Sequence, residues 1–274
     1  MLSEAGKFVE NPSGINPILT KGKIIEQINL NNNYYRIKIK APQIAKEAKP
    51  GQFVMLSMWK NKDPFLKRPF SFYGIESDSG TFDILYKEIG KGTQIMAKSK
   101  VGDLVELIGP LGNGFMIPED TNNIAVVARG IGIATLMPLI LESKKRGITI
   151  YAFLSAQTSN LLLCSNEINS ISEKVFYTTD DGSKGAKGMV TNFLENVLKE
   201  EVIDVVYVCG SKRLTKHIRN LQRKYNFLAF VSLEEHMACG IGACKGCVHK
   251  TKDGYKRVCK EGPIFPVEEV IFGD

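Results

Sequence analysis

No stretch of the chain carries about 18 consecutive apolar residues, the length that a transmembrane helix needs, so we expect no membrane-spanning segment. The opening MLSEAGKFVENPSG lacks a basic segment followed by an apolar core, which argues against a secretory signal. Cysteines are few: there are six, and they are not spread as a disulfide framework would be. These absences predict a cytoplasmic protein, and in that reducing compartment clustered cysteines hold metal or take part in redox chemistry more often than they form disulfides.

The formal net charge is +7, but the basic residues do not form one continuous block. In KNKDPFLKR and ESKKRG they are dispersed and interleaved with acids. This favours an ordinary solvated surface over a nucleic-acid-binding face. Phosphate-bearing cofactors or an acidic protein partner would account for part of the excess, and we expect neither nucleic acid nor membrane as a partner.

The chain of 274 residues is long enough for more than one domain, and its apolar pattern changes along its length. Residues 1–20 are rich in Asn, Pro, Ser and Gly and are interpreted as an extension. Residues 21–115 contain short β runs between turn residues, such as YYRIKIKAP, GQFVMLSMW and TFDILYKEIG. Short strands at this spacing predict an antiparallel β-barrel.

Residues 116–232 alternate apolar strands with helical stretches, which predicts a parallel sheet with helices on both faces. The helical stretch GMVTNFLENVLKEE has apolar side chains on one face. These are Val190, Phe193, Leu194, Val197 and Leu198. Residues 233–274 are expected to form a small module of their own, so the fold class is α+β and multidomain.

That C-terminal segment contains the strongest signal, a run with the spacing Cys-x4-Cys-x2-Cys-x11-Cys. Its members are Cys239, Cys244, Cys247 and Cys259. The first three match the plant-type ferredoxin loop around a [2Fe–2S] cluster, with a fourth thiolate supplied later. The interleaved glycines permit the unusual dihedral angles that such a loop needs.

Two alternatives remain for these cysteines. Structural zinc also takes four cysteines, usually as paired CxxC knuckles, and only one CxxC is present here. Free thiols or disulfides are the other alternative. With four cysteines available, the flanking His236 and His249 are not needed as ligands. Cys164 and Cys209 lie in apolar surroundings and are expected to pack as small buried side chains.

Two segments of the predicted barrel have the chemistry of a phosphate-bearing ligand site. KRPFSFYGI places Arg68 and Ser71 around a rigid proline, and an arginine offers a bidentate fork for phosphate. LYKEIGKGT ends in Gly90, Gly92 and Thr93, a loop whose backbone N–H groups suit a pyrophosphate. Each signal is weak alone, since an Arg-Pro turn in a strand is common.

A third segment, VVARGIGIATLMP, is a strand, a glycine turn and a helix start, as expected for a pyrophosphate site at a helix N-terminus. The segment is not a full GxGxxG motif. A tight connection between a strand and a helix would also require glycine at Gly130 or Gly132, so both interpretations remain open.

Together and in this order, the Arg-Pro-aromatic-Ser segment, the Gly-Thr loop, GPLGNGF and the α/β domain resemble the ferredoxin-NADP reductase superfamily. The C-terminal CGIGACKGC…VCKEGP narrows the resemblance to the electron-transfer subunits of heteromeric, NAD-linked dihydroorotate dehydrogenases. Related sulfide dehydrogenase and NADH-dependent ferredoxin:NADP oxidoreductase subunits commonly carry Asp as the first cluster ligand, where this chain has Cys239. The resemblance runs from about Lys21 to the C-terminal end.

The resemblance implies roles for particular residues. Arg68 would take a phosphate of FAD, Ser71 would lie near the flavin N5, and Gly92 with Thr93 would contact the pyrophosphate. The remaining implied FAD residues are Pro69, Phe70, Leu85, Tyr86 and Lys87. The implied NAD residues are Gly130, Gly132, Asp181, Cys209 and Gly210. The four spaced cysteines would ligate the [2Fe–2S] cluster.

The sequence departs from the family pattern at the nucleotide turn. The family reads Gly-Gly-Gly-x-Gly-x-Ala-Pro, whereas this chain reads Ala-Arg-Gly-Ile-Gly-Ile-Ala-Thr, with Ala128 and Arg129 in place of two glycines and Thr135 in place of proline. Ser211 also stands where proline is usual. Arg129 either binds a nucleotide phosphate or fills the space that a dinucleotide needs.

The resulting hypothesis is an oxidoreductase subunit that relays electrons between NAD(P)H, FAD and a [2Fe–2S] cluster, to or from a flavin-containing catalytic partner in a hetero-oligomer. For the dihydroorotate-type branch this implies pyrimidine biosynthesis. One alternative keeps the module but loses the dinucleotide, so that electrons pass between another oxidoreductase and a ferredoxin or flavodoxin. A second alternative is a zinc-stabilised binding module without enzymatic activity.

Overall fold

The computed structural model describes residues 17–31, 33–59 and 63–273. Of the predicted extension, residues 1–16 lie outside the described residues. Ile18–Thr20 already belong to the first strand, β1 (Ile18–Asn31).

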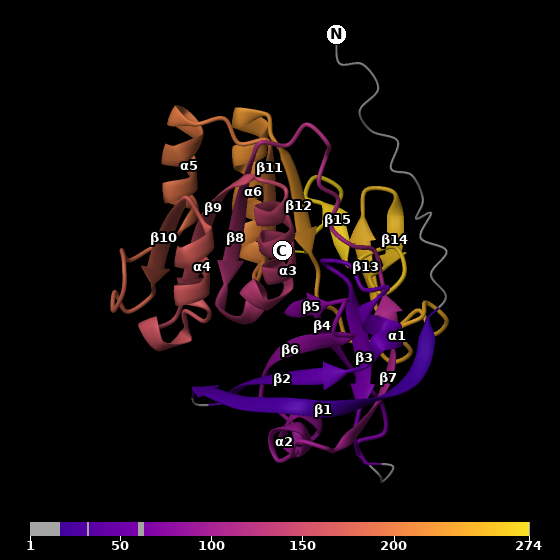
Figure 1. Ribbon diagram of the computed structural model, residues 1–274. Coiled ribbons are helices and arrows are strands. Elements are labelled where there is room, and N and C mark those ends of the chain that lie inside the picture. Colours follow the sequence, from indigo (N-terminus) through magenta and orange to yellow (C-terminus); the bar gives the residue numbers. More distant parts are fainter. Residues whose placement is uncertain (1–16, 32, 60–62, 274) are drawn as a thin grey trace.

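The N-terminal half forms one seven-stranded sheet in the order β4-β3-β7-β1-β2-β6-β5, and each pair of neighbours is antiparallel. Its other strands are β2 (Tyr34–Lys40), β3 (Phe53–Ser57), β4 (Arg68–Ser71), β5 (Gly74–Glu76), β6 (Thr81–Lys87) and β7 (Leu104–Leu111). Only two residues join the edge strands β4 and β5, so the sheet curls back on itself as a half-barrel around its own core (Figure 1). Two short helices, α1 (Pro42–Ala45) and α2 (Lys91–Ala97), lie in its connections.

The second sheet has six strands in the order β10-β9-β8-β11-β12-β15. The first five are parallel, as the alternation of strands and helices predicted: β8 (Asn123–Arg129), β9 (Thr149–Ala156), β10 (Lys174–Thr179), β11 (Val205–Cys209) and β12 (Leu228–Ser232). The strand order reverses between β8 and β11, and in parallel α/β sheets ligands bind in the crevice at the carboxyl ends of the strands at such a point.

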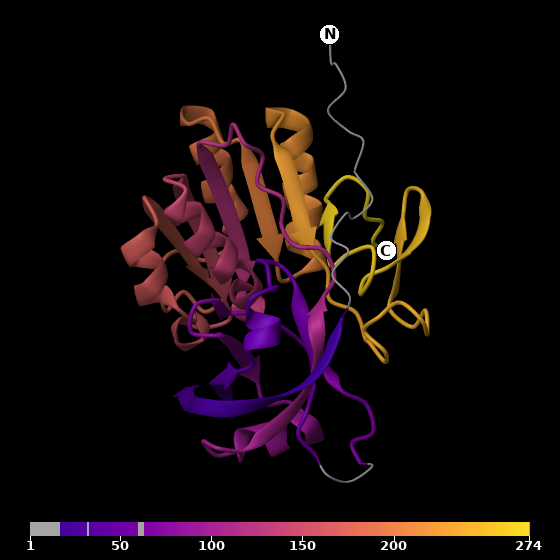
Figure 2. The ribbon, with the colours of Figure 1, turned by 45° about the vertical axis from the view of Figure 1, so that its right-hand side comes forward.

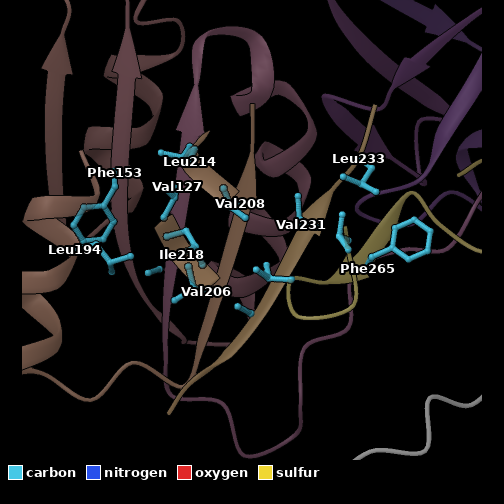
Figure 3. Packing of buried hydrophobic residues seen from close by; sticks show 14 of the residues in the cluster. Val127, Phe153, Leu194, Val206, Val208, Leu214, Ile218, Val231, Leu233 and Phe265 are labelled. Carbon is cyan, nitrogen blue, oxygen red and sulfur yellow. The ribbon is translucent and has the colours of Figure 1, made fainter. Parts of the chain in front are cut away.

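Helices cover both faces of this sheet (Figures 1 and 2). α3 (Ile133–Lys145) and α4 (Ser165–Ile171) pack on one face, and α5 (Thr191–Glu200) and α6 (Lys212–Tyr225) pack on the other. Figure 3 shows Leu194 of α5 and Ile218 of α6 among the strand side chains of the second face. The predicted apolar face of α5 is confirmed, because Val190, Leu194 and Val197 are buried and Phe193 and Leu198 pack against the same core.

The C-terminal segment is joined to both sheets. Its hairpin, β13 (Val248–Thr251) and β14 (Gly254–Arg257), stands alone, whereas β15 (Ile264–Pro266) pairs antiparallel with β12. Asn113, just after β7, donates its backbone N–H to Gly262 O (2.7 Å). No helix among the described residues is long and apolar enough to cross a membrane.

Candidate functional site

The first group of predicted site residues lies on β4, an edge strand of the curled sheet. Arg68, Pro69, Phe70 and Ser71 are all half-buried, and β4 is paired with β3 along its length. The Arg68 guanidinium lies 5.7 Å from the centre of the Trp59 ring and donates to Leu66 O (2.6 Å). The strand thus presents a cation, an aromatic ring and a hydroxyl along one edge.

β6 contributes the second group of predicted residues. Leu85 and Tyr86 are buried, and the exposed Lys87 ammonium lies 5.5 Å from the centre of the Tyr34 ring. The Tyr86 ring meets the ring of Phe70 edge-on at 5.9 Å, which connects β6 with β4. The buried Tyr86 hydroxyl has no hydrogen-bond partner among the described residues, and burial raises its pKa. A buried hydroxyl without a partner is costly, and a bound polar group would satisfy it.

The Gly-Thr loop begins α2. The Thr93 hydroxyl accepts from the backbone N–H of Ile89 (2.9 Å) and Gly90 (3.1 Å) and therefore caps the helix. Gly92 is buried, and a Cβ there would lie 3.3 Å from the Trp59 ring. Since the Thr93 hydroxyl is engaged in the cap, contact with a ligand from this loop would come from its backbone N–H groups.

At the nucleotide turn the two predicted glycines differ. Gly130 has φ +54°, and a Cβ there would meet nothing within 4 Å, so the turn is open on that side. A Cβ on Gly132 would lie 2.6 Å from Cys209 O, so Gly132 is needed where the start of α3 packs on the end of β11. Gly210 has φ +140° and packs against Arg129, where a Cβ would lie 2.9 Å from the Arg129 backbone N.

The Arg129 side chain extends from β8 across the carboxyl end of β9 to the end of β10. There it forms a bidentate ion pair with Asp180, with Nη2–Oδ2 at 2.7 Å and Nη1–Oδ1 at 3.3 Å. Hydrogen bonding to this guanidinium lowers the pKa of Asp180. The guanidinium thus lies on the β10 side of β8, away from the crevice between β8 and β11.

Asp181 and Cys209 differ in exposure. The exposed Asp181 accepts from the N–H and hydroxyl of Ser183, which lower its pKa and shape a turn. Cys209 is fully buried. Burial and the nearby Glu234 raise its pKa, and they outweigh the hydrogen bonds with Thr135 and Ser232, which lower it. Cys209 therefore remains a neutral thiol at the carboxyl end of β11.

Two contacts across the domain interface were not predicted. Thr135 donates to the Ser71 hydroxyl (3.0 Å), joining α3 to β4. The Tyr73 hydroxyl bonds to the carboxylate of Glu167 and to the Cys164 sulfur, the latter at 3.2 Å. Both contacts join residues more than sixty positions apart, so no local pattern could indicate them.

The four predicted cluster cysteines converge at the start of the C-terminal segment as two pairs, and all are free thiols. Cys239 neighbours Cys244, and Cys247 neighbours Cys259. Among the residues that the structure describes, no three His, Cys, Asp or Glu side chains gather closely enough to hold a single metal ion.

Backbone N–H groups surround these sulfur atoms. Gly242 N–H donates to Cys259 Sγ (3.1 Å), and Cys259 N–H donates to Cys247 Sγ (3.4 Å). Cys244 N–H donates to Cys239 Sγ (3.5 Å). Burial opposes ionisation of Cys239, but hydrogen bonds from the backbone of Cys244, Ile241 and Ala243 outweigh it and lower the pKa of Cys239. Burial and the neighbouring Cys247 raise the pKa of Cys259. A loop with such donors suits thiolates.

The cysteine loop packs directly on the curled sheet. Gly240 has φ +72°, and a Cβ there would lie 2.5 Å from Met55 Cγ and 3.1 Å from Leu111 Cδ1. Met55 is opposite Pro69 in the β3–β4 ladder. The loop that carries Cys239 is therefore one strand away from β4.

Comparison with known proteins gives two family matches. Residues 21–115 match the oxidoreductase FAD-binding domain, and residues 234–271 match the iron-sulfur cluster binding domain of dihydroorotate dehydrogenase B. The chain is 35% identical over 254 residues to the electron transfer subunit of dihydroorotate dehydrogenase B (NAD(+)) from Desulforamulus reducens, covering 91% of this chain and 97% of the relative. The corresponding subunit from Caldanaerobacter subterraneus is 41% identical, with coverage of 83% and 89%.

Among solved structures, an NADH-dependent reduced ferredoxin-NADP oxidoreductase is similar with a TM-score of 0.82 and 31% identity, covering 91% of this chain and 89% of that chain. A ferredoxin NADP+ reductase from Neisseria gonorrhoeae has a TM-score of 0.63 and 20% identity, covering 76% of this chain and 91% of that chain. The second likeness concerns the fold alone.

Proposed function

The chain belongs to the family of electron transfer subunits of dihydroorotate dehydrogenase B, and from this premise we propose that it passes electrons between NAD(H) and a catalytic partner subunit. When bound, FAD exchanges electron pairs with a nicotinamide and single electrons with a [2Fe–2S] cluster, and the protein supplies binding and orientation. The partner is a flavin-containing dihydroorotate dehydrogenase subunit in a hetero-oligomer, which places the chain in pyrimidine biosynthesis and, we infer, in the cytoplasm.

The proposed FAD site lies on the edge of the curled sheet. Arg68 holds a phosphate, Ser71 faces the flavin ring, and the backbone of Gly92 and Thr93 contacts the pyrophosphate. Pro69, Phe70, Leu85, Tyr86 and Lys87 line the remainder. The residues suit the group, because the half-buried strand β4 ends in a hydroxyl and the buried Tyr86 hydroxyl lacks a partner among the described residues.

The proposed cluster ligands are Cys239, Cys244, Cys247 and Cys259. A [2Fe–2S] cluster held by four cysteines takes two thiolates on each iron, and the thiols are arranged as two pairs. Backbone donors to all four sulfur atoms would stabilise the negative charge of the thiolates. Zinc is the alternative metal. The presence of iron and acid-labile sulfide in the purified protein would exclude it.

One observation supports the relay above all others, the packing of the cysteine loop on the sheet that carries β4. Gly240 touches Met55, and Met55 pairs with Pro69 of the proposed FAD strand. Electron transfer between two bound groups requires them to be close, and this packing brings the two proposed binding segments together. A substrate acid or base is not part of the proposal, since the partner carries the chemistry of dihydroorotate.

The proposed NAD(H) site is the crevice at the carboxyl ends of β8 and β11, formed by Gly130, Gly132, Cys209 and Gly210 with Asp181 beyond it. Gly130 leaves the turn open, and the Arg129 guanidinium is held by Asp180 on the other side of β8. Arg129 therefore leaves this crevice free. We place the flavin domain at residues 21–115, the nucleotide domain at 116–232 and the cluster module at 233–274, after an extension of residues 1–20.

The decisive experiment is an anaerobic absorption titration of the purified protein with NADH, followed by dithionite. Bleaching of both the flavin and the iron–sulfur bands by NADH is the expected result. Bleaching by dithionite alone would refute the NAD(H) part and favour the alternative in which no dinucleotide binds and electrons come from another carrier. Absence of iron and acid-labile sulfide would refute the relay itself.

A further inference from the structure

Thr135 occupies the point where the two large sheets meet through polar side chains. It lies in the first turn of α3 and is 4% exposed. Its hydroxyl donates to Ser71 Oγ at 3.0 Å, and it also lies within hydrogen-bonding reach of the Cys209 sulfur. The three side chains form a row, here called the Ser71–Thr135–Cys209 row, that runs from β4 to the end of β11.

Close backbone packing holds this row in place. Gly132 allows the start of α3 to approach the Cys209 carbonyl, because a Cβ at Gly132 would lie 2.6 Å from that oxygen. Three residues later, on the same turn, Thr135 is directed between the strands. The family pattern that this segment resembles has proline at this position, and proline has no hydroxyl.

The direction of the bonds follows from counting protons. A threonine hydroxyl has one proton, and Thr135 gives it to Ser71. Ser71 Oγ is then an acceptor on the Thr135 side, so its own proton points elsewhere. Cys209 is a fully buried thiol at the other end of the row. In the bond between α3 and β4, Thr135 is thus the donor and Ser71 the acceptor.

The geometry points to Thr135 as a positioning residue that fixes the Ser71 hydroxyl as a donor toward the flavin and connects it to the nucleotide domain. This inference rests on the proposed function, because it needs FAD beside Ser71. Thr135 does not touch the reacting atoms and acts through Ser71 alone. Without its hydroxyl, Ser71 is free to rotate, and its donor is no longer held toward the flavin.

The test uses the full chain, reconstituted with FAD and iron–sulfur cluster, in four forms beside the parent. Thr135→Val keeps the volume and removes the hydroxyl, and Thr135→Ser keeps the hydroxyl. Ser71→Ala and the double variant complete a mutant cycle. The readouts are the FAD dissociation constant, the shape of the flavin absorption band and the rate of flavin reduction by NADH.

We expect Thr135→Val to raise the FAD dissociation constant and slow reduction by roughly two- to tenfold, the range that one hydrogen bond supports. The flavin band should shift, Thr135→Ser should restore parent values, and Thr135→Val should add nothing in the Ser71→Ala background. Parent-like values for Thr135→Val would overturn the inference. It would also be overturned if Thr135→Val had the same effect in the Ser71→Ala background as in the parent. A parent chain that holds no FAD would instead refute the proposed function, which keeps the two failures distinct.

Discussion

The contact between Gly132 and the end of β11 gives a prediction whose size follows from the structure. In Gly132→Ala the new Cβ would lie 2.6 Å from Cys209 O, 2.8 Å from its carbonyl carbon and 3.1 Å from Gly210 N. All three atoms are backbone, so no side-chain rotation relieves the overlap. Restoring an ordinary separation of about 3.4 Å requires a shift of about 0.8 Å between α3 and β11.

Overpacking of this kind costs about 1–3 kcal/mol of the free energy of unfolding. For a chain of this size that corresponds to a decrease in Tm of roughly 2–10 °C. The same shift, if directed along the Thr135–Ser71 line, would lengthen their 3.0 Å hydrogen bond beyond hydrogen-bonding distance. Flavin reduction by NADH should therefore slow together with the loss of stability.

The assay is urea unfolding of the apoprotein, with thermal melting as a second measure. Gly90→Ala is the matched control, because a Cβ there meets nothing within 4 Å and its φ of −160° suits any residue. We expect Gly90→Ala to remain within about 0.5 kcal/mol of the parent. Equal unfolding free energies for the two variants would refute the tight approach of α3 to β11.

Two further predictions concern a buried carboxyl and a cluster thiol. Burial raises the pKa of Asp83 to about 6, so ionisation of this group destabilises the fold as the pH rises from about 4 to 6. Asp83→Asn should remove that pH dependence and stabilise the protein at pH 8 by up to about 3 kcal/mol. An unchanged pH profile of the free energy of unfolding in urea would contradict this. Cys244→Ser should reduce iron and acid-labile sulfide content, whereas the control Cys164→Ser should not, and equal iron content in both would remove Cys244 from the ligand set.

Features that depend on local pattern were predictable from the sequence. The alternation of YYRIKIK predicted β2, and the apolar spacing around Leu194 predicted the buried face of α5. The glycines between the cysteines predicted a loop with unusual dihedral angles, and Gly240 and Gly242 have φ of +72° and +80°. In each case the information lies within about a dozen residues, where side-chain periodicity and turn chemistry act directly.

Features that depend on packing between distant segments were not predictable. β15 joins β12 of the second sheet, although its few residues have no strand pattern of their own. The contact of Gly240 with Met55 joins residues nearly two hundred positions apart, and the glycine could equally have served the loop alone. The sequence offered Gly132 both as a pyrophosphate contact and as a packing glycine, and only its distance to Cys209 O showed the packing requirement.

Each of three residues that depart from the family pattern, Ser211, Arg129 and Thr135, makes a side-chain hydrogen bond or ion pair in this chain. Ser211, where proline is usual, caps α6 by accepting from Leu214 N–H (3.2 Å). Arg129, where glycine is usual, is held by Asp180, and Thr135, where proline is usual, bonds to Ser71. A site that had merely decayed would not be expected to gain a cap, an ion pair and a hydrogen bond at its altered positions. These substitutions therefore favour a nucleotide edge that has been rebuilt around a different set of contacts, and the NADH titration tests whether it still accepts a dinucleotide.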